Sequence, residues 1–295
     1  MATLKELKIR IGSVASSEKI TGAMKMISSA KVHKEEQSLR RLKPFKDQIK
    51  SIMGHILSTG ENFNSPLIET RDVKRAGIVV YGSDDGLCGA YNINIFKGLL
   101  IEIDRLRQEY GRELHVELYP VGKKMSKAVR HLEDDLLEVK VFEGVDSKMP
   151  GEVVTGFTKK LRDAFLAGEL DIVETVYMNF RSMSRQTLTT EQLFPVTEKM
   201  LTSGAEGEED NRLYIFEPDA NSIFNEVLPM FVMSTMQEIT VQNRASEQAA
   251  RVMAMQSAND NAKKLFDELQ LEYNKLRQQS ITTELLDILG GQVER

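Results

Sequence analysis

The residues best placed to do chemistry form the turn from Gly82 to Gly89, which reads GSDDGLCG. The turn follows an apolar run and opens a helical pattern, which is where a mononucleotide-binding fold holds a phosphate. Its glycine spacing does not match G-x-G-x-x-G, no G-x-x-x-x-G-K-[ST] sequence occurs in the chain, and two adjacent carboxylates would repel a phosphate. We therefore predict a structural turn, with nucleotide binding as the alternative. The residues expected to shape it are Ser83, Asp84, Gly86, Cys88 and Gly89.

The single cysteine and the four histidines form no recognisable catalytic or metal-binding pattern. Cys88 lacks the local signature of a nucleophile and is expected to be a small buried residue; alone, it excludes an intrachain disulfide and a cysteine zinc cage. The histidines, at His33, His55, His115 and His131, lack metal-ligand spacing. We expect no catalytic residue, no metal site and no cofactor in this chain.

The C-terminal stretch from about Asn221 to Gly290 predicts one long helix, because its only proline, Pro229, lies near its start and no glycine precedes Gly290. Its second half repeats apolar or small residues in steps of three or four, which is typical of a coiled-coil seam. The seam consists of Val252, Met255, Ala258, Ala262, Leu265, Leu269, Tyr273 and Leu276. Such a seam needs a partner helix or a sheath of other proteins.

The first 57 residues predict a second long helix, with Thr3 and Glu6 as a capping box at its start. Pro44 is expected to kink or locally break it. These residues carry 12 Lys or Arg against 5 Asp or Glu, whereas residues 218–295 carry 7 against 11, so the two terminal helices have opposite charge and suit each other as a pair. Nucleic-acid binding is not expected, because Phe45 is the only aromatic residue in the basic segment.

Between the two helices the pattern changes to alternating strands and helices, which predicts a small open sheet with helices on its faces. Strands are expected at 76–81, 114–119 and 137–142, helices at 91–110, 123–132 and 151–167, a strand pair at 171–180 and 185–194, and an acidic loop at 202–210. The fold class is α/β plus coiled coil. We predict a coiled-coil helix over 1–58, a Rossmann-like α/β domain over 59–217, and a second coiled-coil helix over 218–295 that pairs with the first.

Three stretches, in this order, together resemble the gamma subunit of F-type proton-translocating ATP synthases. They are LKELKIRIGSVASSEKITGAMKMISSAK at the start, the turn SDDGLCGAYNINIFK, and ASEQAARVMAMQSANDNAKKLF followed by LEYNKLRQQSITTELLDILGG near the end. The resemblance implies a central rotor stalk without an active site. Its helices would enter the catalytic ring of alpha and beta subunits, and its α/β domain would contact the epsilon subunit and the membrane-embedded c-ring.

The resemblance also implies coupling contacts with the catalytic subunits. The positions that match are Met24, Lys25, Arg251, Arg277, Gln278 and Thr282. Each of the first five has a plainer interpretation: Met24 as seam packing, Lys25 and Arg251 as solvated surface, and Arg277 and Gln278 as ordinary helix surface. The apolar residues of the C-terminal tip would lie in a bearing of the ring; they are Ile281, Leu285, Leu286, Ile288 and Leu289.

Two features depart from the family pattern. Asp85 stands where members commonly carry a basic residue, and the cysteine pair inserted in chloroplast relatives is missing. No stretch approaches the roughly 18 apolar residues of a transmembrane helix, and the start at Met1 without a transit peptide favours a peripheral protein on the cytoplasmic face of a bacterial plasma membrane. The rival interpretation from another class is an adaptor whose coiled coil forms a homodimer.

Overall fold

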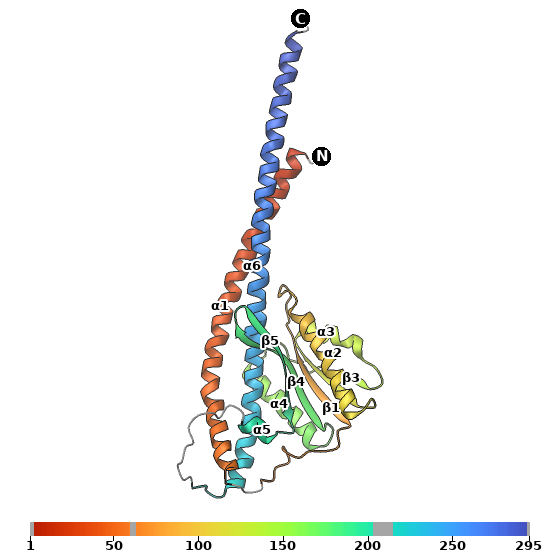
Figure 1. Cartoon of the computed structure of the whole chain (residues 1–295), viewed down its shortest axis with the longest axis vertical. Helices are drawn as coiled ribbons and strands as arrows, with labels where there is room; N and C mark the ends of the chain where they lie inside the picture. Colours follow the sequence, from red (N-terminus) through yellow and green to blue (C-terminus); the bar gives the residue numbers. More distant parts are fainter. Residues whose placement is uncertain (1–2, 60–62, 203–214, 294–295) are drawn as a thin grey trace. The chain divides into compact units, whose positions relative to one another are not determined.

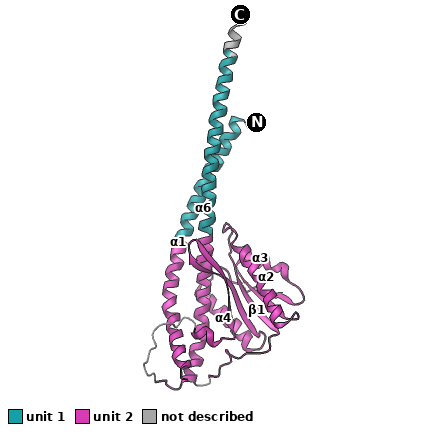
Figure 2. Ribbon diagram, in the orientation of Figure 1, with its two compact units in different colours: residues 1–29, 251–295 teal, residues 30–250 magenta. Residues whose placement is uncertain are grey.

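The computed structural model describes residues 3–59, 63–202 and 215–293 of the 295-residue chain. It divides into two compact units, residues 1–29 with 251–295, and residues 30–250 (Figure 2). Two helices, α1 (Leu4–Leu57) and α6 (Ala220–Val293), supply residues to both units. Each unit is described by itself below. The expected domain boundaries at 58 and 217 stay a prediction.

In the first unit, the start of α1 lies antiparallel to the second half of α6 (Figure 2). The capping box is confirmed: the backbone N–H of Thr3 donates to Glu6 Oε2 at 2.9 Å, and that of Glu6 donates to Thr3 Oγ1 at 3.2 Å. The two helices approach closely at Gly22, where an added Cβ would lie 3.4 Å from Asn259 Nδ2. The side chain of Asn259 donates to the carbonyl oxygen of Glu18 at 2.7 Å, which locks the register of the pair.

The predicted seam of α6 is only partly buried. Val252, Met255 and Leu269 are buried, whereas Leu265 is 45% exposed, so its expected place in the seam is wrong. A helix of 3.6 residues per turn drifts relative to a straight partner, and a position that extends the pattern in sequence can rotate out of the contact. Beyond the start of α1, helix α6 continues with no other helix of the described residues beside it (Figure 2).

A kink or a local break was expected at Pro44. Helix α1 is continuous from Leu4 to Leu57 with Pro44 inside it, so the local break does not occur. Proline removes one helical hydrogen bond and leaves the carbonyl of Arg40 without its usual donor. Both Pro44 and Arg40 are exposed, so water can satisfy that carbonyl.

The second unit contains a five-stranded sheet (Figure 1). Its strands are β1 (Arg75–Tyr81), β2 (His115–Val121), β3 (Leu137–Val139), β4 (Ile172–Ser182) and β5 (Arg185–Phe194). They lie in the order β3-β2-β1-β4-β5, with β1 to β4 parallel and β5 antiparallel to β4. The predicted α/β class is therefore confirmed, and β1, the strand before the GSDDGLCG turn, is central.

Four shorter helices belong to the second unit: α2 (Tyr91–Tyr110), α3 (Lys123–Val129) with a 3₁₀ turn η1 (Arg130–Leu132), α4 (Gly151–Leu166) and α5 (Glu198–Thr202). The first three match the predicted helices within a few residues, whereas α5 was not expected. Of the acidic loop predicted at 202–210, all but Thr202 lies outside the described residues.

The sheet has a buried core on each face, because successive strand residues point to opposite sides. In β1, Ala76, Ile78 and Val80 pack towards α2 and α3, and Val79 and Tyr81 belong to the opposite core. That second core is built from α4 together with the parts of α1 and α6 that lie within residues 30–250. The end of β1 therefore meets α6 directly.

Candidate functional site

The turn after β1 is held by hydrogen bonds within the chain. The backbone N–H of Ser83 donates to Asn92 Oδ1 at 3.0 Å, and Asn92 Nδ2 returns a bond to Ser83 Oγ at 2.8 Å. Ser83 Oγ donates in turn to the carbonyl oxygen of Asp85 at 2.8 Å. Asn92 was not singled out from the sequence, although its place in the first turn of a predicted helix after a serine-containing turn is a usable signal.

Asp84 links the turn to two other segments. Its carboxylate accepts the backbone N–H of Lys123, the first residue of α3, at 3.0 Å, and the hydroxyl of Ser147 at 2.9 Å. The residue is 8% exposed. A buried carboxylate thus lies in the turn, and its charge would repel a phosphate placed beside it. This geometry supports the structural interpretation of the turn and disfavours the nucleotide alternative.

The glycines of the turn have different roles. Gly89 has φ 61°, and Leu87, with φ 64°, also adopts the left-handed conformation that disfavours side chains. A Cβ on Gly86 would meet nothing within 4 Å, whereas one on Gly82 would lie 2.6 Å from Met125 Cβ. Gly82, which was not among the expected shaping residues, is therefore the glycine that packing requires.

Cys88 and Asp85 complete the turn. Cys88 is 3% exposed, with Asn92 Nδ2 at 3.5 Å from its sulfur, which agrees with a small packed residue. Asp85, the position that departs from the family pattern, is exposed and pairs with Lys148 at 2.7 Å, an interaction that raises the pKa of the lysine. An acidic residue is thus accommodated by a cation from a neighbouring loop.

Helix α6 contacts this turn through Asn243. Its Nδ2 donates to the carbonyl oxygen of Gly82 at 3.3 Å, and its Oδ1 accepts the hydroxyl of Tyr91 at 2.5 Å. One helical turn earlier, Thr240 Oγ1 lies 3.0 Å from the hydroxyl of Tyr81, the last residue of β1. Burial raises the pKa of that phenol, so it stays neutral and available for the bond.

Strand β4, which lies next to β1 in the sheet, is hydrogen-bonded to the same helix, α6. Ser246 Oγ donates to the carbonyl oxygen of Met178 at 2.8 Å, and Gln242 Oε1 accepts the backbone N–H of Phe180 at 3.0 Å. The strand order reverses between β1 and β4, and open α/β sheets bind their ligands at such a point, beyond the carboxyl ends of the strands. Here residues 240–246 of α6 fill that position.

A cluster of charges that sequence reasoning missed lies between α2 and β4. Arg105 donates to Glu102 at 2.5 Å, to Glu109 at 2.5 Å and to Glu174 at 2.6 Å. Glu174 is 5% exposed and its Oε2 has no hydrogen-bond partner among the described residues. Burial, and next the nearby Glu102, raise the pKa of Glu174 to about 7 despite Arg105.

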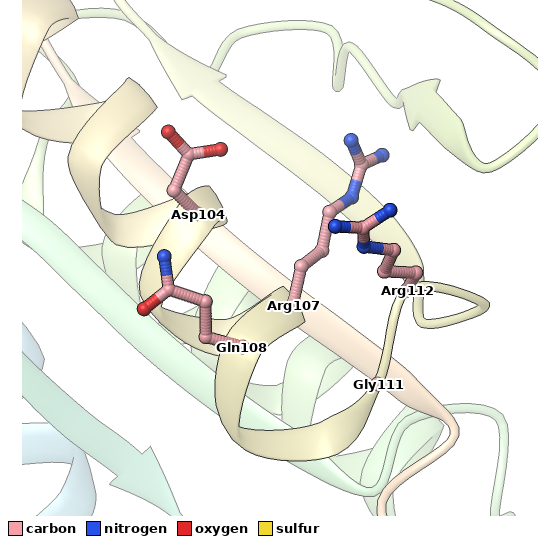
Figure 3. A pocket seen from close by; sticks show the side chains of 5 residues that line it. All are labelled: Asp104, Arg107, Gln108, Gly111 and Arg112. Carbon is pink, nitrogen blue, oxygen red and sulfur yellow. The ribbon is translucent and has the colours of Figure 1, made fainter.

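The remaining cavities and histidines offer no comparable site. A shallow cavity of about 630 Å³ at the end of α2 is lined by Asp104, Arg107, Gln108, Gly111 and Arg112. Figure 3 shows the two guanidinium groups side by side, with Asp104 and Gln108 to their left in the view. Since Arg107 also lies 3.9 Å from Asp134, we assign this cavity no ligand. Within the described residues, no three His, Cys, Asp or Glu side chains gather as a metal site.

Comparison with known proteins identifies the family. A family model described as ATP synthase matches residues 3–293. ATP synthase gamma chains of Phocaeicola vulgatus and Bacteroides thetaiotaomicron are 40% and 37% identical to this chain, over 99% of both chains in the first case and 100% in the second. The chain belongs to the ATP synthase gamma chain family.

Two chains from solved ATP synthase structures are similar in fold. A chain of the Euglena gracilis mitochondrial ATP synthase, in a structure of OSCP, F1 and c-ring, aligns with a TM-score of 0.60 and 18% identity, covering 98% of this chain and 93% of that one. A chain from the rotor of the same enzyme aligns with a TM-score of 0.58 at 16% identity, covering 94% and 98%. At these identities the likeness speaks for the fold alone.

The residues that the gamma-chain resemblance marks as coupling contacts all belong to the first unit. Met24 and Lys25 are half-buried on α1, whereas Arg277 and Gln278 are exposed on α6. Arg251 is 6% exposed, so its interpretation as solvated surface is wrong.

Thr282 lies one turn beyond Gln278 and donates its hydroxyl to the carbonyl oxygen of that residue at 2.9 Å. The apolar tip is open to solvent in this single chain: Ile281, Leu285, Leu286 and Ile288 are 49–63% exposed. The side chain of Leu289 lies outside the described part. None of the helices in the described ranges is long and apolar enough to cross a membrane.

Proposed function

We propose that this chain is the central rotor stalk subunit of an ATP synthase. It couples ion-driven rotation of the membrane ring to successive conformational changes in the catalytic subunits, and it has no active site of its own. The observation that carries this proposal is the match to gamma chains along nearly the whole chain, at 35–40% identity for relatives from Bacteroides, Phocaeicola and Ralstonia.

The architecture of the first unit supports a shaft. Beyond the antiparallel pair, the free end of α6 exposes Ile281, Leu285, Leu286 and Ile288, which a protein in water does not leave uncovered in such density. A surrounding ring of alpha and beta subunits would cover them. Rotation of an asymmetric shaft changes which catalytic subunit it contacts, and this difference in contact is what biases each subunit among its states.

The partners follow from the same proposal. The α/β domain contacts the epsilon subunit and the membrane-embedded c-ring, while the helical pair enters the catalytic ring. The similar solved chains come from a rotor and from assemblies that include a c-ring, which supports these partners. Because the relatives are bacterial, we infer a peripheral position on the cytoplasmic face of the plasma membrane.

Met24, Lys25, Arg251, Arg277, Gln278 and Thr282 are proposed as coupling contacts. Arg277 and Gln278 have the strongest structural support, since both are exposed on α6. A guanidinium there can meet a carboxylate of a catalytic subunit, and an adjacent amide can add a neutral hydrogen bond. Single exposed contacts of this kind are weak, which suits a surface that must move.

The test is affinity purification of the tagged full-length chain from gently solubilised membranes, followed by an ATPase assay. We expect alpha, beta and epsilon subunits in the eluate, together with ATPase activity that the isolated chain lacks. Recovery of the chain as a homodimer without these subunits would favour the adaptor interpretation and contradict the stalk.

The coupling residues are tested in the same complex with the double variant Arg277→Ala, Gln278→Ala. We expect the ATPase rate to fall about two- to fivefold, since an exposed ion pair contributes up to about 1 kcal/mol. The matched control is Arg40→Ala, Gln48→Ala on α1, where both residues are also exposed. Equal rates in the two double variants would remove the coupling role of Arg277 and Gln278.

A further inference from the structure

One stretch of α6 is buried through polar side chains, although buried helix faces are usually apolar. Thr240 is 1% exposed, Asn243 1% and Ser246 0%. The three residues follow one another at intervals of three and therefore lie on one face of the helix. The preceding part of α6, within residues 224–239, buries apolar residues in the core shared with α1 and α4. Where it passes the sheet, the helix therefore adds buried polar contacts to its apolar ones.

Each of these side chains has a different anchor in the α/β domain. Thr240 meets the hydroxyl of Tyr81 at the end of β1, and Ser246 donates to the backbone of Met178 in β4. Asn243 bonds both the backbone of Gly82 and the hydroxyl of Tyr91, the first residue of α2. One helix face is therefore tied to two strands and to a helix on the far side of β1.

The type of contact determines how strongly it opposes a rotation of α6 against the sheet. Apolar burial is non-directional, so two apolar surfaces can rotate slightly against each other at little cost. Buried hydrogen bonds depend on distance and angle, and a buried polar group that loses its partner is penalised because water cannot replace it. Two of the anchors, Gly82 and Met178, accept through backbone carbonyls, which cannot turn away as a side chain can.

We propose that Thr240, Asn243 and Ser246 form a torsional lock, which fixes the rotational angle of α6 against the sheet of the α/β domain. The proposal rests on the proposed stalk function. In a rotor, torque reaching the α/β domain passes through this polar contact into α6. These three residues lie at the edge of the sheet where other open α/β folds bind a ligand. Helix α6 therefore occupies the position that a ligand takes in those folds.

The test uses the assembled complex with the catalytic ring fixed to a surface. A bead is attached to the α/β domain through a Glu143→Cys label, since Glu143 is exposed and Cys88, the single native cysteine, is buried. The triple variant is Tyr91→Phe, Asn243→Leu, Ser246→Ala. With the ring stalled, we expect the variance of the bead angle to rise at least about twofold, because variance varies inversely with stiffness and three of the four hydrogen bonds named above are removed.

A second readout in the same preparations is ion pumping per ATP hydrolysed, which we expect to fall while the rate of ATP hydrolysis is retained. The control is Asn94→Leu, Ser51→Ala, which makes the asparagine and serine changes of the triple variant at exposed positions of α2 and α1. A triple variant that assembles and hydrolyses ATP normally, but shows the angular variance of the control, would overturn the lock.

The proposal can still be tested if the triple variant fails to fold. Ser246→Ala alone deletes one oxygen and one hydrogen bond, so it is used if the triple variant fails to assemble; an angular variance equal to that of Ser51→Ala would again overturn the lock. Failure of the unmodified chain to assemble with alpha and beta subunits would contradict the stalk function instead, which separates the two proposals.

Discussion

The hydroxyl of Tyr91 donates a hydrogen bond of 2.5 Å to Oδ1 of Asn243, which ties the first residue of α2 to α6 across 152 positions of sequence. The same hydroxyl lies 3.0 Å from the carbonyl oxygen of Asn243. Tyr91 is 4% exposed and Asn243 is 1% exposed, so water does not compete for this bond. The start of the helix that follows the GSDDGLCG turn is thereby joined to α6 two residues before the tail motif begins at Ala245.

Removing the hydroxyl in Tyr91→Phe should therefore destabilise the chain. The ring still packs, but the Asn243 oxygen is left buried without its donor, which costs about 1–2 kcal/mol of unfolding free energy. Chemical denaturation of the full chain, followed by circular dichroism, measures the change. Tyr273→Phe is the matched control because Tyr273 is part-exposed; equal midpoints for the two variants would mean that the bond contributes nothing.

Packing at the start of the turn gives a second prediction, for Gly82→Ala. The added Cβ would lie 2.6 Å from Met125 Cβ, an atom close to the backbone that cannot swing away, so we expect a loss of about 1–3 kcal/mol. Gly86→Ala in the same turn is the control, since nothing lies within 4 Å of its added Cβ. Thermal unfolding of both variants decides the matter, and a Gly82→Ala protein as stable as Gly86→Ala would show that the turn can shift.

The long helices and the alternation of strands and helices along the chain could be predicted because they depend on repeating patterns, whereas the order of the strands in the sheet was not predicted. Helix α2 was predicted at its observed bounds, 91–110, since its apolar residues repeat at helical spacing between a turn and Gly111. Short elements carry no such repeat: α5, with five residues, was missed for this reason. The local break expected at Pro44 was wrong because the effect of a proline inside a helix depends on whether the carbonyl of Arg40, which loses its hydrogen bond, can reach water. The sequence does not state this.

The proposed torsional lock was not predicted from the sequence for a different reason. Thr240, Asn243 and Ser246 have the composition of a solvated helix face, and only their continuation of the face buried by Met236 and Ile239 indicates burial. The partners of Asp84 could not be predicted either, because they come from α3 and a distant loop. Periodicity identifies which face is buried, but long-range hydrogen-bond partners require the assembled fold.

The two adjacent carboxylates of the turn give a third prediction, because they differ in burial. Asp84→Ala deprives the N–H of Lys123 and the hydroxyl of Ser147 of their charged acceptor, and we expect a loss of about 2–3 kcal/mol. Asp85→Ala breaks an exposed pair with Lys148 and should cost at most about 1 kcal/mol. Denaturation midpoints of the two variants test this, and a larger loss for Asp85→Ala would reverse the assignment.

The charge cluster between α2 and β4 predicts a dependence of stability on pH. The pKa of Glu174 is raised from 4.5 to about 7, first by burial and then by Glu102, while Arg105 opposes the shift. A carboxyl whose pKa is higher in the folded state favours folding when protonated. Its contribution is complete below about pH 4.5 and is lost as the pH rises through about 7. No described group donates to Glu174 Oε2, so only its own proton can bridge it to Glu102.

Glu174→Gln should remove this dependence. The amide oxygen still accepts from Arg105, and the amide N–H₂ supplies to Glu102 the donor that the protonated acid supplied. At pH 8 we expect the variant to be more stable than the unchanged chain by about 1–3 kcal/mol, and at pH 5 the two should be nearly equal. Denaturation at a series of pH values measures both. The control is Glu113→Gln at an exposed position, whose unfolding free energy should equal that of the unchanged chain at every pH. If the unfolding free energy of Glu174→Gln varied with pH in the same way as that of the unchanged chain, Glu174 would not titrate between pH 5 and 8.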